Sequence, residues 1–582
     1  MLRIPIIAFC AALLLAGCGS SSSVNSAALP PLPAPDGQGQ PGPAVGTSRA
    51  GVSYDVNIPG ADGNIAFTVH EPSTLVGGQT YPLLLNGPGF GLVRENAALR
   101  DVEAPAGTPL ADIQTTAQYT NAGYGVISFD QHGFGQSGGT VTIMDPDHDG
   151  PNLIKIVDWA EVNLNWVMYR PDASGNPGMV LGSYGGSYGG MYQYLLNNID
   201  PRHRLKAMAP AISPYELGYS LGSGGVPKSG YGLALTALGE DSLATGEGGM
   251  DPAALGVLED GLENNVFTAS DYAYLHYHSN AYFCEGVTQP GKRPATHPPK
   301  VDVLLLQGMS DALFNLNEAK ANYDCLSASG GDVRLYTYVI GHVLPAGAGL
   351  APTNEGLLPT GAPGLSDDYR CGPYVADALT RLWFDAKLKQ DPAAIAQLAT
   401  MPNTCINLGT SGEGVVVNSV PVGGSNSVPI AVTAVPELAP VPMTVPLYTA
   451  TTTTVVAGIP TATLTLADPN ATPALPAGLP LGVSSNDAII YVSVGVSRAG
   501  AVPAALEILG DQIRPVRGFG TQTLQLNGIG VKLNAGDQLS LVIAGQALTQ
   551  YPLIIARNPL LPTVNVSGSV QLPVLGNVST LN

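Results

Sequence analysis

The chain is poor in basic residues, and this shortage excludes one large class of proteins at once. Only 24 Lys and Arg stand against 44 Asp and Glu among 582 residues, so the formal net charge is −20. Nucleic-acid binding is excluded because no basic stripe could offset the repulsion from phosphates. Charged residues make up only 12% of the chain, while 72 Gly and 50 Pro favour turns and β-structure over long charged helices. A chain of this length is too long for one core, and we expect two or three domains.

The chain also lacks long apolar runs, and the apolar run at its N-terminus is short. Arg3 is followed by the apolar segment 4–15, which has the length of a secretory signal and not of a membrane span. The segment ends in Leu-Ala-Gly-Cys18, which resembles the lipobox of bacterial lipoproteins and implies a lipid on the Cys18 sulfur. We therefore expect a lipid anchor in the cell envelope, on the periplasmic or outer face. A secreted protein with an incidental cysteine is the alternative.

Cysteine is scarce, and no C-x-x-C pair is present, which argues against zinc-ribbon and thioredoxin-like sites. Two of the six cysteines lie in the signal region. The other four are Cys284, Cys325, Cys371 and Cys405. An even number in an exported protein predicts two disulfides. Of the three connectivities, sequence proximity favours Cys284–Cys325 and Cys371–Cys405.

The most informative motif is Gly-Gly-Ser187-Tyr-Gly, which matches the pattern G-x-S-x-G. An apolar, strand-like segment precedes it and a helical pattern follows it. This is the setting of a nucleophile elbow, where a serine lies in a strained turn with its hydroxyl exposed. Ser183 lies in an overlapping repeat, but Leu181 replaces the first glycine of its motif, so we predict Ser187 as the nucleophile. A glycine-rich loop that merely closes a β–α unit is the alternative.

A serine nucleophile needs a base and a group that orients the base, and both follow Ser187 in the required order. The apolar segment 301–306 runs into Asp311, and the segment 334–340 runs into His342. Parallel strands end at the same edge of a sheet, so these two residues should lie at the edge that carries the elbow. We predict a Ser187–His342–Asp311 triad.

The oxyanion of the reaction needs backbone donors. One should be the N–H of Tyr188, the residue after the nucleophile. The other should come from the loop after an early strand, where Asn-Gly-Pro88-Gly-Phe90-Gly stands. Because Pro88 has no N–H, Gly89 or Phe90 is the expected donor. A plain turn is the alternative.

The pattern of strands and helices indicates an α/β fold in two halves, with a cap inserted between them and a β-sandwich after them. Strands alternate with helices up to residue 209, which predicts a largely parallel sheet. Weak helices and glycine-rich loops follow, as in an inserted cap, before the sheet resumes. After residue 402 only short Val-, Thr- and Ile-rich runs remain, which predict a β-sandwich of jelly-roll type. We assign 1–17 to the signal peptide, 18–50 to a flexible tether, 51–209 to the first half of the α/β-hydrolase fold, 210–300 to the cap, 301–402 to the second half and 403–582 to the β-sandwich.

Several motifs together resemble the cocaine-esterase-like and X-Pro dipeptidyl-peptidase group of α/β-hydrolases. They are Gly-Ser187-Tyr-Gly-Gly190, the loop Asp130–Gly138, which resembles D-x-R-G-x-G-x-S-G, Asp158-Trp159, the W-F-D-x-x-L-K segment Trp383–Lys389, and a β-rich tail with Pro446-Leu447 and Asn558-Pro559. His132 departs from the pattern, since it replaces the usual arginine. The likeness covers residues 50–575 and implies acyl transfer from an ester or amide to water, with Ser187, Asp311 and His342 as the triad.

We therefore expect an exported serine hydrolase for a small-molecule or peptide substrate, either a carboxylesterase or a peptidase of X-Pro dipeptidyl type. A surface lipoprotein that has lost activity and binds glycans or partners is the alternative. No metal or organic cofactor is expected. The segment 145–150 begins like a calcium loop, but Ile156 stands where the loop needs a glutamate. His276 and His278 are two apart, which does not suit a metal pair on a helix.

Overall fold

The structure is a computed structural model that describes residues 45–97, 114–171, 175–241, 248–342, 369–437, 442–472, 488–500, 506–553 and 561–582. The predicted signal peptide and Cys18 lie outside these residues. Within the described ranges, no helix combines the length and the apolar character that crossing a membrane requires.

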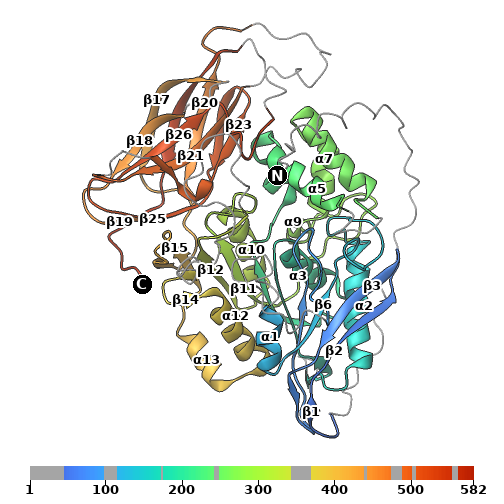
Figure 1. Cartoon of the computed structure of the whole chain (residues 1–582). Coiled ribbons are helices and arrows are strands. Elements are labelled where there is room, and N and C mark those ends of the chain that lie inside the picture. Colours follow the sequence, from blue (N-terminus) through green and yellow to red (C-terminus); the bar gives the residue numbers. More distant parts are fainter. Residues whose placement is uncertain are drawn as a thin grey trace, which may run out of the picture. The chain divides into compact units, whose positions relative to one another are not determined.

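The central element of the fold is a ten-stranded mixed sheet (Figure 1). Its strands, in spatial order, are β16 (Gly414–Val417), β15 (Thr404–Asn407), β12 (Val333–Tyr338), β11 (Asp302–Gly308), β10 (Leu205–Ala211), β9 (Leu181–Gly186), β5 (Leu83–Asn86), β6 (Gly125–Phe129), β3 (Asn64–His70) and β2 (Ser53–Pro59). The strands from β15 to β6 run parallel, while β16, β3 and β2 pair antiparallel at the two ends. The predicted α/β-hydrolase sheet is therefore confirmed.

Helices cover both faces of this sheet, which explains its nearly continuous apolar strands. On β11, Val303 and Leu305 belong to one core and Leu304 and Leu306 to the other, as the two-residue period of a strand requires. The first core packs against α2 (Asp149–Asn163), α3 (Tyr188–Ile199) and α10 (Leu316–Ala328). The second packs against α1 (Gln114–Asn121), α12 (Ala376–Phe384) and α13 (Pro392–Ala399).

A helical insertion separates β10 from β11. Its helices are α4 (Leu217–Gly222), η3 (Ser223–Gly225), α5 (Ser229–Gly239), α7 (Pro252–Asn264), α8 (Ala269–Tyr277) and α9 (Asn280–Glu285). Several of them start at clear capping residues. Thr268 and Asp271 form a reciprocal capping box on α8, and Asp251 caps α7 with a proline in its first turn.

The C-terminal part is an all-antiparallel β-domain (Figure 1). It has its own apolar core. Its first sheet has the order β17 (Ser427–Pro436), β27 (Thr563–Gln571), β20 (Thr461–Ala467) and β24 (Gly520–Gln525). Its second has the order β18 (Met443–Thr449), β26 (Gln538–Ala544), β21 (Ile489–Ser497) and β22 (Leu506–Ile508), and β23 (Arg514–Arg517) also pairs with β21. Its third joins β25 (Ile529–Leu533), β19 (Thr454–Gly458) and β28 (Val574–Gly576).

The predicted start of the β-sandwich at residue 403 needs correction. The strands β15 and β16, between residues 404 and 417, belong to the central sheet, where β15 pairs with β12. Short Val-rich strands look alike in either sheet, so the pattern alone does not distinguish them.

The structure contains both favoured disulfides. Cys405 of β15 is joined to Cys371, and Cys284 is joined to Cys325.

Candidate active site

Ser187 lies at a strained turn between β9 and α3. It is the residue before the helix, and its φ of 59° and ψ of −122° are rare for any residue other than glycine. Its N–H donates to the carbonyl of Ala211 (2.9 Å), and its carbonyl accepts from the Ser213 hydroxyl (3.1 Å). The backbone is thus held in this geometry by the end of the neighbouring strand β10 and by the loop directly after it. This is the strand–turn–helix setting that the motif predicts.

The glycines of the motif are there because the backbone of another loop passes directly beside them. A Cβ on Gly189 would lie 2.1 Å from the carbonyl oxygen of Gly87, and a Cβ on Gly185 would lie 2.8 Å from the same oxygen. Gly185 also has a φ of +149°, which strains any side chain. The backbones of the turn and of the loop after β5 therefore approach each other too closely for a side chain at Gly185 or Gly189.

Ser183 occupies a different environment. It lies within β9 between Leu85 of β5 and Met208 of β10, and it is fully buried. Its hydroxyl donates to the side chain of Gln193 on α3 (3.1 Å). It packs inside the sheet, whereas Ser187 is only half-buried at the end of the strand.

Asp311 and His342 are brought together at the same edge of the sheet, after β11 and β12. The Nδ1 atom of His342 lies 2.7 Å from Oδ2 of Asp311, whose carboxylate is fully buried. The other carboxylate oxygen accepts the N–H groups of Leu313 (3.0 Å) and Phe314 (2.7 Å). These bonds fix the carboxylate, and the carboxylate orients the imidazole through its Nδ1 atom.

The predicted hydrogen bond between the serine and the histidine of the triad is not formed in this structure. Among the described residues, no hydrogen bond joins the Ser187 hydroxyl to the His342 ring. Both side chains are partly exposed, and such bonds are often loose until substrate is bound. The structure thus joins acid and histidine and places the serine at the end of the same parallel strands.

The predicted oxyanion loop lies against the elbow. A Cβ on Gly89 would be 3.9 Å from the carbonyl oxygen of Gly186, the residue before the nucleophile. The Phe90 ring packs edge-on against the Tyr188 ring, with centroids 5.3 Å apart. The side-chain amide of Gln131 donates to the carbonyl of Pro88 (3.2 Å) and ties this loop to the one after β6.

The β-domain reaches the loop that carries Asp311. The side-chain amide of Gln512, which is 3% exposed, donates to the carbonyls of Met309 (3.1 Å) and Asp311 (2.8 Å). Beyond this loop, at the start of α10, the side chain of Asn317 donates to Leu526 (3.0 Å) and accepts from Gly528 (2.9 Å). All these residues belong to one compact unit, Leu32–Asn582. The sequence carries no signal for these contacts, because they join residues about 200 positions apart.

The cap supplies two more residues that the sequence analysis missed. The ammonium group of Lys228 donates to the carbonyls of Ala312 (2.8 Å) and Leu313 (3.1 Å), and burial lowers the pKa of Lys228 to about 8. The Tyr231 hydroxyl donates to the carbonyl of His342 (2.7 Å). The only sequence signal for Lys228 is that it is the one charged residue in a stretch rich in Gly, Ser and Leu.

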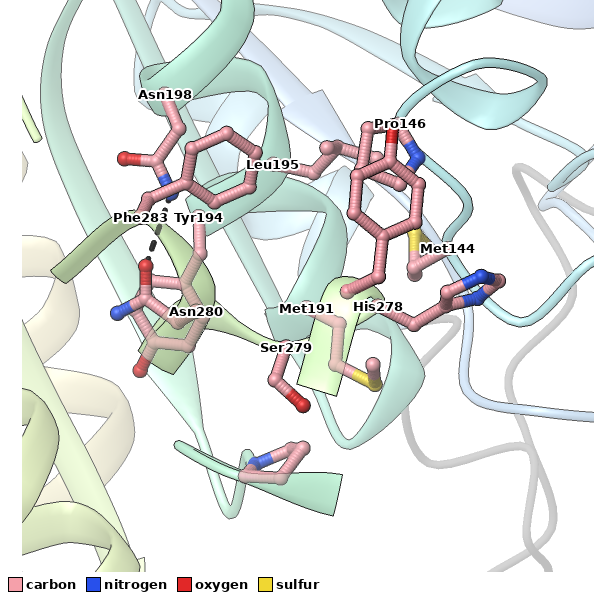
Figure 2. Close-up of a pocket in the computed structure, with 12 residues that line it drawn as sticks. Met144, Pro146, Met191, Tyr194, Leu195, Asn198, His278, Ser279, Asn280 and Phe283 are labelled. Carbon is pink, nitrogen blue, oxygen red and sulfur yellow. Dashed lines mark hydrogen bonds between the residues drawn. The ribbon is translucent and has the colours of Figure 1, made fainter. Parts of the chain in front are cut away.

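The cap also meets the elbow helix, as Figure 2 shows. Met144, Met191 and His278 line a small cavity there, and at one side Asn198 of α3 donates to Asn280 of α9 (2.9 Å). The cavity has a volume of about 20 Å³, which is room for about one water molecule. In this conformation it is too small for a substrate.

The segment that resembles a calcium loop has protein partners. Asp147 is paired with Arg293 and accepts the Tyr277 hydroxyl (2.8 Å), and Asp145 lies 3.3 Å from His278. His276 forms a separate pair with Glu216 (2.6 Å between Nδ1 and Oε2).

Together, the mixed sheet, the strained serine and the acid–histidine pair define a protein of the α/β-hydrolase class. Residues 63–343 match the model of the X-Pro dipeptidyl-peptidase (S15) family. Over these residues, which are just under half of the chain, the sequence is similar to that family of serine hydrolases. No curated protein matches the sequence.

Solved structures show the same fold over nearly the whole chain. A CocE/NonD family hydrolase from Staphylococcus aureus is 11% identical, with a TM-score of 0.58, and the match covers 90% of this chain and 97% of that one. An α-amino acid ester hydrolase is 14% identical, with a TM-score of 0.59 and coverage of 93% and 99%. An aminopeptidase from a marine sediment Thaumarchaeota archaeon is 12% identical, with a TM-score of 0.57 and coverage of 90% and 96%.

Proposed function

We propose that the protein hydrolyses ester or amide bonds through Ser187, His342 and Asp311. The observation that carries this proposal is the strained Ser187 at the end of β9, on the sheet edge where Asp311 holds His342 at 2.7 Å. A serine hydroxyl is a weak nucleophile, and this arrangement supplies the base and its orienting group.

The chemistry follows from the positions of these groups. The Ser187 oxygen bonds to the acyl carbon while its proton passes to Nε2 of His342, and Asp311 stabilises the imidazolium. The carbonyl oxygen becomes negative and is held by the N–H of Tyr188 and by that of Gly89 or Phe90. The alcohol or amine then leaves with the proton from His342. Water hydrolyses the acyl-enzyme by the same proton route.

The substrate is either an ester, as for a carboxylesterase, or a peptide of the X-Pro type. The family match favours a peptidase, while one solved structure of the same fold is an ester hydrolase and another an aminopeptidase. A panel of p-nitrophenyl esters beside X-Pro p-nitroanilides distinguishes the two classes. Ser187→Ala and Asp311→Asn should each lower kcat by several orders of magnitude on the preferred substrate. A wild-type protein without turnover on any substrate, and without covalent labelling, would instead support the inactive binding protein.

We also propose that the protein is attached to the cell envelope through a lipid on Cys18. The support is the sequence Leu-Ala-Gly-Cys18 at the end of the apolar N-terminal segment. Cys18→Ser should release the protein from the membrane fraction or block its processing. An unchanged membrane fraction with an unchanged N-terminus would contradict the anchor.

A further inference from the structure

We propose that Asp62, His132 and His148 form a binding site for one divalent transition-metal ion, with Zn²⁺ as the best-matched ion. One ligand atom from each of the three side chains lies within 4.8 Å of the others. His132 and His148 come from the loop after β6 and the residue before α2, and Asp62 lies in the turn between β2 and β3. The site goes beyond the proposed hydrolase function and does not depend on it.

The three segments are held together without a metal. Nδ1 of His148 lies 2.6 Å from a carboxylate oxygen of Asp62, and the two imidazoles stack with centroids 6.3 Å apart. Lys155 of α2 donates to the carbonyl of Pro59 at the end of β2 (3.3 Å), so the turn and the helix lie side by side (Figure 1). The ligands are thus brought within reach of one ion before the ion binds.

A buried side chain stands where a metal-bound histidine needs a partner. His132 is 5% exposed, and its Nδ1 lies 2.9 Å from the amide nitrogen of Asn152, which is 6% exposed. The Asn152 oxygen has no hydrogen-bond partner among the described residues. Turning this amide by half a rotation places its oxygen on Nδ1, so that Nδ1 carries the proton and Nε2 is free to bind the ion. Such a partner fixes the tautomer and the ring orientation of a metal ligand.

The chain provides the space that this imidazole needs. Gly139 has a φ of +87°, and a Cβ on it would lie 2.2 Å from Cε1 and 2.5 Å from Nε2 of His132. The motif that the loop resembles has an arginine at position 132, and a guanidinium is always charged and offers no lone pair. Histidine at position 132 therefore supplies a lone pair that the arginine of that motif would not supply.

The donor set selects the class of metal. Two imidazoles and one carboxylate suit Zn²⁺ and its transition-metal neighbours, whereas Ca²⁺ and Mg²⁺ need mainly oxygen ligands. The side chains of Asp62 and His148 are 44% and 42% exposed, so the ion can enter from solvent and water can complete its coordination. A bound ion would connect the β2–β3 turn to the start of α2 and stabilise the folded state.

The test is titration of the untagged full chain, stripped of metals with a chelator, with Zn²⁺ and separately with Ca²⁺ by calorimetry. Asp62→Asn and His148→Gln should lower the Zn²⁺ affinity at least tenfold, and the exposed His203→Gln is the matched control that should leave it unchanged. Zn²⁺ should raise the Tm of the wild type and of His203→Gln but not of the other two variants. Equal Tm values in chelator establish that both half-exposed ligand variants fold.

Three results would overturn the proposal. The first is Zn²⁺ binding that is the same in the wild type and in both ligand variants. The second is binding that disappears in His276→Gln instead, since His276 has its own carboxylate partner. The third is Ca²⁺ binding of equal strength at the same residues, because a hard cation would contradict the imidazole ligands.

Discussion

The contact between the β-domain and the loop that carries Asp311 should contribute to both stability and catalysis. Gln512→Met keeps the length of the side chain but removes both hydrogen bonds to the carbonyls of Met309 and Asp311. A buried acceptor left without a partner costs about 1–3 kcal/mol, so two of them should lower the free energy of unfolding by about 2–6 kcal/mol. The loss falls on the loop that positions Asp311.

We expect the effect on catalysis to exceed the effect on substrate binding. A shift of about 1 Å in a catalytic group can lower the rate about 100-fold, so kcat should fall by about 10- to 100-fold. KM should change little, because Gln512 acts through Asp311 and not through the substrate. Steady-state kinetics on the best p-nitrophenyl ester, measured below the lowered Tm, gives both values.

The chain offers a matched control for this variant. The amide of Gln522 also donates to two carbonyls, those of Arg517 (2.7 Å) and Gly518 (3.2 Å), but both lie within the β-domain. Gln522→Met should therefore lower Tm without changing kcat. Full kcat in Gln512→Met, or an equal loss of activity in Gln522→Met, would show that Gln512 does not position Asp311.

Three further predictions concern stability. Replacing Cys371 and Cys405 by Ala should lower the free energy of unfolding by about 4 kcal/mol, as chain entropy predicts for a separation of 34 residues; equal denaturant midpoints would refute this. Burial raises the pKa of Glu318 from 4.5 to about 7, so the folded chain holds a proton that the unfolded chain releases between these pH values. This contribution, about 3 kcal/mol, is present below pH 4.5 and lost as pH rises through 7, and Glu318→Gln should remove that slope from a series of Tm values. Gly189→Ala should fail to fold normally, because its Cβ would lie 2.1 Å from the carbonyl oxygen of Gly87; a wild-type Tm would contradict the tight turn.

The features predictable from the sequence are those that local pattern determines. The elbow at Ser187 can be recognised from the glycines of its motif, because close backbone contacts exclude a Cβ at those positions. Asp311 and His342 follow buried apolar strands, and parallel strands bring the residues after them to one edge. The two favoured cysteine pairs are joined for a similar reason, since each closes a short stretch of chain.

The remaining features depend on contacts between distant segments. Gln512 reaches Asp311 across 201 positions, and a glutamine in a β-rich tail has no pattern that indicates this contact. The ligands Asp62 and His148 are 86 positions apart, and His132 looked only like a departure from a motif. The strand that contains Cys405 was assigned to the wrong sheet, because alternation reveals a strand but not its neighbour.

We propose Ser187, and not Ser183 in the overlapping repeat, as the nucleophile. Ser183 is fully buried in β9 and donates to Gln193, whereas Ser187 lies at the elbow. The most direct measurement is the mass of each protein after reaction with a fluorophosphonate probe, for the wild type, Ser187→Ala and Ser183→Ala. We expect one covalent label on the wild type and on Ser183→Ala and none on Ser187→Ala, with the Tm of Ser187→Ala nearly unchanged. A label on Ser187→Ala but not on Ser183→Ala would contradict this proposal.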